Sequence, residues 1–144
     1  MNNDLTNELL NAYEEIAAYQ RENEGEVHYT KQDLLNDYDE LIQISRQPVY
    51  RCVQLRDLNN LDYEKLGVYW TNDRNMAKSY EGQTGEDYVI EAQITIDNID
   101  IGNSIVLRRL YDEEEVRLID GKFVKVLNIY KNNKPLNISG NFLT

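Results

Sequence analysis

The chain has 144 residues, a hydrophobic fraction of 41% and a formal net charge of −11 at pH 7. This length fits one domain with one core, and eleven Tyr supply aromatic material for that core, so the composition excludes a disordered chain. The charge excludes unassisted binding to DNA or RNA phosphates, which needs a surplus of Lys and Arg, and favours a basic protein partner. Solubility alone also explains such a charge.

The first ten residues contain no basic stretch followed by an apolar one, and no apolar run reaches the roughly 20 residues that cross a bilayer. We therefore expect a cytoplasmic protein without membrane contact. A single Cys, Cys52, excludes an internal disulfide, and a single His, His28, leaves no cluster for zinc. We expect no bound metal.

Two amphipathic helices are predicted first. In residues 5–19, Leu9, Tyr13 and Ile16 recur at helical spacing. A second helix is predicted to begin near Thr30 and to end near Ser45, again with its apolar residues on one face. Proline 48 then marks the change from helix to strand.

Strands dominate the rest of the chain. Residues 49–55 (VYRCVQL), 67–71 (GVYWT) and 88–96 predict three strands, and residues 72–82 predict a helix capped by Asn72 or Asp73. Residues 99–107 predict a loop with a further strand. Residues 113–120 and 123–130 predict a hairpin that turns at Asp120 and Gly121. Helices first and strands later indicate a single α+β domain, with a helical preface over 1–46, a sheet over 47–132 and a tail over 133–144.

Arg51 is an unusual residue for the middle of an apolar strand, because a charge there is unfavourable unless it is paired or used. By alternation it shares a face with Val49 and Val53. It fits an edge strand that reaches solvent, an ion pair with an acidic residue, or a site for an anion or a ribose.

Two further features have both a structural and a functional interpretation. Glu113 and Glu115 point to the same side of their predicted strand, either into solvent or together into a cleft. Tyr69 and Trp70, taken alone, are typical core aromatics.

The segment GVYWTNDRNMAKSY, residues 67–80, resembles the second motif of the poly(ADP-ribose) polymerase and ADP-ribosyltransferase families, G-[IV]-Y-[FW]-[AST]-[DN] followed by a helix that ends in Tyr. In those families two tyrosines eleven residues apart hold the nicotinamide ring of NAD+, and Tyr69 and Tyr80 have that separation. The order Arg51, residues 67–71, Glu115 also resembles the family order. The resemblance covers residues 49–130, and the two helices resemble the helical preface of bacterial members.

The resemblance implies a mainly antiparallel split β-sheet of ADP-ribosyltransferase type with an NAD+ cleft. It implies that Glu115 is the catalytic carboxylate and that Glu113 selects the acceptor group. The residues that it implies for NAD+ binding are Arg51, Cys52, Gly67, Tyr69, Thr71 and Tyr80. The sequence departs from the family twice, because Cys52 replaces a Gly and Tyr69 stands where Arg-bearing members more often have Ser, with Thr71 as the closest substitute.

The function implied by the resemblance is a mono-ADP-ribosyltransferase that moves ADP-ribose from its substrate NAD+ to a protein acceptor and releases nicotinamide. The acceptor stays open, with nucleic-acid-binding proteins among the candidates. The small size and the abundance of Asn, Asp and Tyr fit an effector of a phage or mobile element. Two alternatives also stay open: an inactive acidic protein that occupies a basic or nucleic-acid-binding site on a partner, and an NAD+ glycohydrolase.

Overall fold

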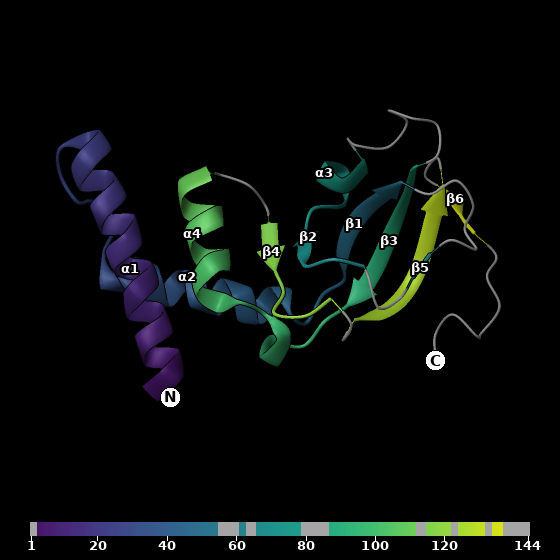
Figure 1. Cartoon of the computed structure of the whole chain (residues 1–144), viewed down its shortest axis with the longest axis horizontal. Coiled ribbons are helices and arrows are strands. Elements are labelled where there is room, and N and C mark those ends of the chain that lie inside the picture. The colour runs from purple at the N-terminus through teal and green to yellow at the C-terminus, as the bar shows by residue number, and fades with distance from the viewer. Residues whose placement is uncertain are drawn as a thin grey trace.

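The computed structural model describes residues 3–54, 61–62, 66–78, 87–111, 115–121, 124–131 and 134–136. Two helices come first, α1 over Asn3–Glu24 and α2 over Lys31–Ile44, and an antiparallel sheet follows, which confirms the predicted α+β class. Figure 1 shows α1 at one end of the molecule and the sheet at the other. Within the described ranges, no helix is long and apolar enough to cross a membrane.

Both predicted N-terminal helices form. In α1, Leu9 and Ile16 lie on one buried face, and Gly25 follows the helix at a φ of 80°. In α2, the side chain of Thr30 caps the first turn and Ser45 follows the last one. The predicted boundaries of the second helix are therefore confirmed.

The strands of the described residues form one six-stranded sheet in which all neighbours run antiparallel. Their order across the sheet is β4 (Glu115–Arg117), β2 (Tyr69–Thr71), β1 (Val49–Gln54), β3 (Asp87–Gln93), β5 (Lys125–Lys131) and β6 (Lys134–Pro135). Helix α3 (Arg74–Lys78) follows β2 and packs on β1 and β2. Asp73 caps it, because the Asp73 Oδ1 accepts a hydrogen bond from Asn75 N at 2.9 Å.

Helix α4 (Ile101–Tyr111) corrects the prediction of a loop and a strand over residues 99–107. The β-branched residues there resemble a strand, but Ile101, Ile105 and Val106 lie on one helix face and are buried. In Figure 1, α4 stands between α1 and β4. Packing against α1, α2 and β4 thus overrides the weak local preference.

The predicted hairpin over residues 113–130 is wrong. β4 pairs with β2, and β5 pairs with β3, so β2, β1 and β3 all lie between the two strands. The expected turn is held by another segment instead, because Asp120 N donates to Asn98 Oδ1 at 3.0 Å. Next to it, Gly121 packs on the backbone of Gly67. Between β4 and β5 the chain therefore crosses from one edge of the sheet to its opposite half.

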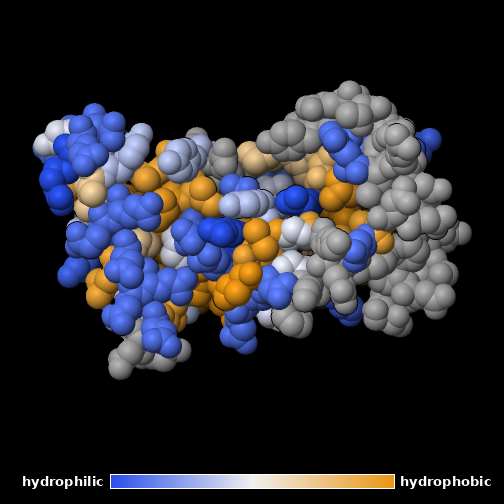
Figure 2. All heavy atoms as spheres, viewed as in Figure 1, coloured by the Kyte–Doolittle hydropathy of each residue, from blue (hydrophilic) through white to orange (hydrophobic). Residues whose placement is uncertain are grey.

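One cluster of buried hydrophobic side chains continues from the helices into the sheet. Its members include Ile16 of α1, Leu41 of α2, Ile105 of α4, Trp70 of β2 and Ile90 of β3, each 1% exposed or less. Figure 2 shows hydrophilic side chains over most of the visible face of α1. The helices and the sheet therefore share one core.

Candidate functional site

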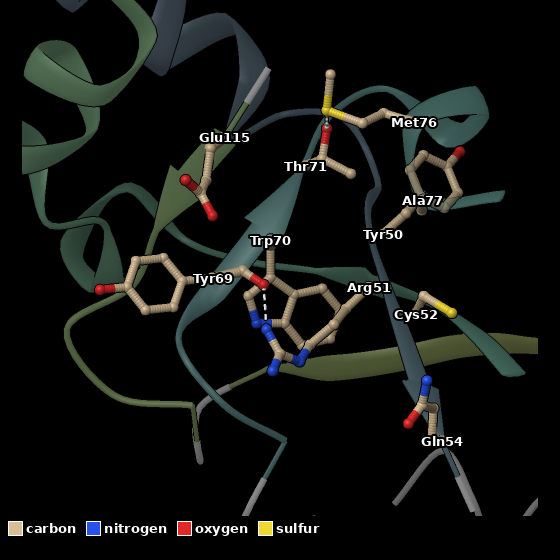
Figure 3. A pocket seen from close by; sticks show the side chains of 10 residues that line it. All are labelled: Tyr50, Arg51, Cys52, Gln54, Tyr69, Trp70, Thr71, Met76, Ala77 and Glu115. Carbon is tan, nitrogen blue, oxygen red and sulfur yellow. Dashed lines mark hydrogen bonds between the residues drawn. The ribbon is translucent and has the colours of Figure 1, made fainter. Parts of the chain in front are cut away.

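A pocket of about 560 Å³, named the candidate pocket below, lies where β1, β2 and β4 meet α3 (Figure 3). The lining residues are Tyr50, Arg51, Cys52 and Gln54 of β1, Tyr69, Trp70 and Thr71 of β2, Met76 and Ala77 of α3, and Glu115 of β4. Arg51, Tyr69 and Glu115 are far apart in the sequence. They meet because their three strands are neighbours in the sheet.

Strand pairing decides which side chains share a face of the sheet. Tyr50 pairs with Thr71, and Thr71 pairs with Glu115, so these three side chains lie on one face. Cys52 follows Tyr50 at a spacing of two and lines the pocket on that face. Trp70 points to the opposite face, where it is 1% exposed.

Sequence reasoning did not single out Tyr50 and Gln54. Period-two alternation along β1 places both beside Cys52, so this pattern was the signal that could have found them. Burial raises the pKa of Tyr50, and the neighbouring carboxylate of Glu91 raises it further.

Tyr69 and Trp70 have different environments although both were typical of a core. Tyr69 is 45% exposed, so the core interpretation is correct for Trp70 only. The Tyr69 ring extends toward β4 in Figure 3, and the guanidinium of Arg117 lies 5.5 Å from the ring centroid. Trp70 Nε1 donates to Gly67 O at 3.0 Å, which satisfies its one donor inside the core. Tyr69 is therefore the aromatic side chain of β2 that a ligand can reach.

Arg51 approaches the pocket from the opposite face of the sheet. Its Nη1 donates to Tyr69 O at 2.5 Å, and its Nε is buried with no hydrogen-bond partner in the described part of the chain. Burial lowers the pKa of Arg51, while the charge of Glu115 acts in the other direction. Since β1 is central in the sheet, the alternative of an edge-strand arginine is wrong.

Two predicted NAD+-binding residues have structural roles in the turns before and after β2. Gly67 is not in the pocket lining; it has a φ of 89°, and a Cβ atom there would lie 3.0 Å from the guanidinium carbon of Arg51. Thr71 lines the pocket, and its Oγ1 accepts a hydrogen bond from Asp73 N at 3.0 Å. The same hydroxyl lies 3.9 Å from Met76 Sδ. Thr71 thus joins β2 to the start of α3.

Tyr80 and Glu113 lie outside the described residues, so the second nicotinamide tyrosine and the acceptor-side carboxylate stay predictions. Within the described ranges, no group of three His, Cys, Asp or Glu side chains is arranged to hold a metal ion. Comparisons with known protein families, curated proteins and solved structures found no match to this chain. Functional inference therefore depends on the residue pattern and on the geometry of the candidate pocket.

Proposed function

We propose that the candidate pocket binds the nicotinamide end of NAD+ and that the protein transfers ADP-ribose to a protein acceptor. One observation carries this proposal: Arg51, Tyr69 and Glu115 line a single pocket from three neighbouring strands. These are three of the eight residues that the resemblance assigns to NAD+ binding and catalysis. The sheet order was not used in that assignment, so the convergence is independent support for it.

Tyr69 and Glu115 have different roles in the proposed reaction. The exposed ring of Tyr69 offers a stacking surface for the nicotinamide, with Tyr80 as its predicted partner. The Glu115 carboxylate stabilises the positive charge that develops on the ribose as its bond to nicotinamide breaks. Nicotinamide leaves with the bonding electron pair, a nucleophile of the acceptor bonds the same ribose carbon, and its proton passes to solvent or to a carboxylate such as Glu113.

Arg51 has two functions in this proposal. Its bond to Tyr69 O holds the backbone of the residue that stacks the nicotinamide. The chain as a whole has a net charge of −11, which repels the NAD+ pyrophosphate. The positive charge of Arg51 in the pocket lining reduces this repulsion where the pyrophosphate must approach. A guanidinium suits both functions because it presents five donors in a fixed fork.

Nicotinamide release tests the proposal directly. The purified protein is incubated with NAD+, with and without a cell lysate, and free nicotinamide and protein-bound ADP-ribose are measured. Release that requires lysate, together with labelled protein, supports transfer. Release without lysate identifies an NAD+ glycohydrolase. Absence of both release and NAD+ binding would refute the proposal and leave the acidic binding protein, which the net charge of −11 favours.

A matched pair of carboxylate variants tests the assignment of Glu115. Glu115→Gln should lower the rate of nicotinamide release by about 10²-fold or more, because the stabilising charge acts mainly in the transition state. NAD+ affinity should stay within about threefold, as expected for a group that acts mainly in the transition state. Glu22→Gln is the control, since Glu22 is an exposed carboxylate of α1 and lies outside the pocket lining. Equal rates for the two variants would contradict the assignment.

A further inference from the structure

Strand β4, which carries Glu115, lies at the edge of the sheet and has α4 on its outer side. The side chain of Ser104 in α4 and the backbone of Asp100 bond the strand there. Ser104 Oγ accepts from Arg117 N at 2.9 Å and donates to Arg117 O at 3.2 Å. Asp100 N, just before α4, also donates to Arg117 O, at 2.8 Å. α4 thus takes the place of a further strand along β4.

Arg108 of α4 lies at the other end of β4, next to the pocket. Its Nη1 donates to Asn72 Oδ1 at 2.7 Å and lies 3.5 Å from Glu115 O. Its Nη2 donates to Glu40 Oε1 of α2 at 2.6 Å. The side chain of Arg108 is only 12% exposed, whereas that of Glu40 is 55% exposed. One guanidinium therefore joins α2, β4 and the turn after β2.

The contacts of Ser104 and Asp100 lie at one end of β4, and those of Arg108 lie at the other end, beside the pocket. Asn72 directly follows Thr71, and Thr71 pairs with Glu115. Arg108 thus contacts both strands at the Thr71–Glu115 pair, because it bonds Asn72 next to Thr71 and lies beside Glu115 O. A displacement of about 1 Å at a reacting group is enough to lower a rate by about 10²-fold.

We propose that Arg108 is a positioning residue, which fixes β4 against the turn after β2 and so sets the place of the Glu115 carboxylate. The forked guanidinium is suited to this because several rigid donors bond different segments at once. The kinetic consequence rests on the proposed function. The positioning itself does not, and it can be measured without turnover.

Arg109 provides a matched control in the same helix. Its Nε and Nη2 donate to the Asp37 carboxylate at 3.1 and 2.7 Å, and its guanidinium carbon lies 5.1 Å from the Tyr29 ring centroid. Neither partner lines the candidate pocket. Arg109→Met therefore removes a comparable ion pair between α4 and α2 without touching β4 or the turn after β2.

The kinetic arm compares Arg108→Met with Arg109→Met in the full chain. Arg108→Met should lower kcat for nicotinamide release by about tenfold or more and leave KM within about threefold, as expected for a misplaced catalytic group. Arg109→Met should keep the kcat of the unchanged protein. Glu40→Gln, at an exposed position, should lower kcat in the same direction and serves if Arg108→Met fails to fold. Equal kcat values for the unchanged protein, Arg108→Met and Glu40→Gln would overturn the proposal.

The second arm measures amide hydrogen exchange in residues 69–73 and 115–118. Exchange there should be faster in Arg108→Met than in Arg109→Met, because only the first loses the bonds that join these segments. Equal exchange would overturn the positioning role whether or not the protein is active. If the unchanged protein neither binds nor cleaves NAD+, the proposed function fails, and exchange alone then decides the role of Arg108.

Discussion

Gly67 and Gly121 allow two backbone segments to meet behind the candidate pocket. Gly67 has a φ of 89°, which residues with a Cβ atom rarely adopt, and its small volume leaves room for the Arg51 guanidinium. A Cβ atom on Gly121 would collide with the carbonyl oxygen of Gly67. Gly67 therefore affects the pocket lining through Arg51, and the role in NAD+ binding that the resemblance implies for it stays a prediction.

Replacing Gly67 by Ala should destabilise the protein more than replacing Gly25. Both substitutions place a side chain at a positive φ, which costs about 1–2 kcal/mol. At Gly67 the Arg51 guanidinium must also move, whereas no atom of the described residues lies within 4 Å of a Cβ atom at Gly25. The free energy of unfolding in urea, measured for both variants, gives the difference. Equal losses would mean that Arg51 moves away without penalty.

At the scale of single elements, a capping box fixes the start of α2 at Thr30. Thr30 Oγ1 accepts from Asp33 N at 3.0 Å, and the Asp33 Oδ2 accepts from Thr30 N at 2.9 Å. These hydrogen bonds lower the pKa of Asp33 from its ordinary value of 3.8. The cap therefore works best with an ionised carboxylate.

The stability that Asp33 contributes should be lost in acid. Because the pKa of Asp33 is lower in the folded state, its contribution is complete above the unfolded value and disappears as the pH falls through the folded value. Between about pH 5 and pH 3, the unchanged protein should therefore lose more stability than Asp33→Asn. Urea unfolding at several pH values measures this difference, with Asp39→Asn on the exposed side of α2 as the control. A constant difference between Asp33→Asn and the unchanged protein would contradict it.

The sequence predicted elements with strong local signals and failed where distant contacts decide. Thr30 and the apolar spacing of the first two helices are local signals, and so is the alternation in β1 and β3. Helix α4 was missed because Gly102 and Asn103 weaken its helical pattern, while the contacts that stabilise it come from α1, α2 and β4.

The pairing of β4 could not be predicted for a related reason. Alternation puts Val116 and Leu118 on the face opposite Glu115, and both are buried, but alternation says nothing about which strand lies alongside. The Asp120 and Gly121 turn signal favoured a hairpin, whereas Asp120 is bonded to Asn98, and β4 pairs with β2 and not with β5. Five residues of the pocket lining were thus singled out from the sequence, namely Arg51, Cys52, Tyr69, Thr71 and Glu115. Tyr50 and Gln54 were not, and neither was the strand that lies beside β4.

At the scale of the whole molecule, the helices and the sheet are bound into one core. Ile16 of α1 and Ile105 of α4 belong to the same buried cluster as Trp70 of β2 and Ile90 of β3. The ion pairs of Arg108 and Arg109 also join α4 to α2. Neither layer can open without exposing apolar surface of the other.

Unfolding should therefore appear as one transition with two different probes. Trp70, the single Trp of the chain, reports on β2, and the helical circular dichroism signal reports mainly on α1, α2 and α4. Denaturant midpoints from tryptophan fluorescence and from circular dichroism should coincide, since both layers share the core. Separate midpoints would show that the helical part unfolds independently of the sheet.

The bonds from Ser104, Asp100 and Arg108 to β4 also affect how this molecule behaves in a crowded solution. An open edge strand offers unpaired N–H and C=O groups to strands of other chains, which leads to aggregation. On β4 the outward groups of Arg117 are already bonded to Ser104 and Asp100. The contacts that hold the carboxylate strand in place therefore also protect it from edge-to-edge assembly.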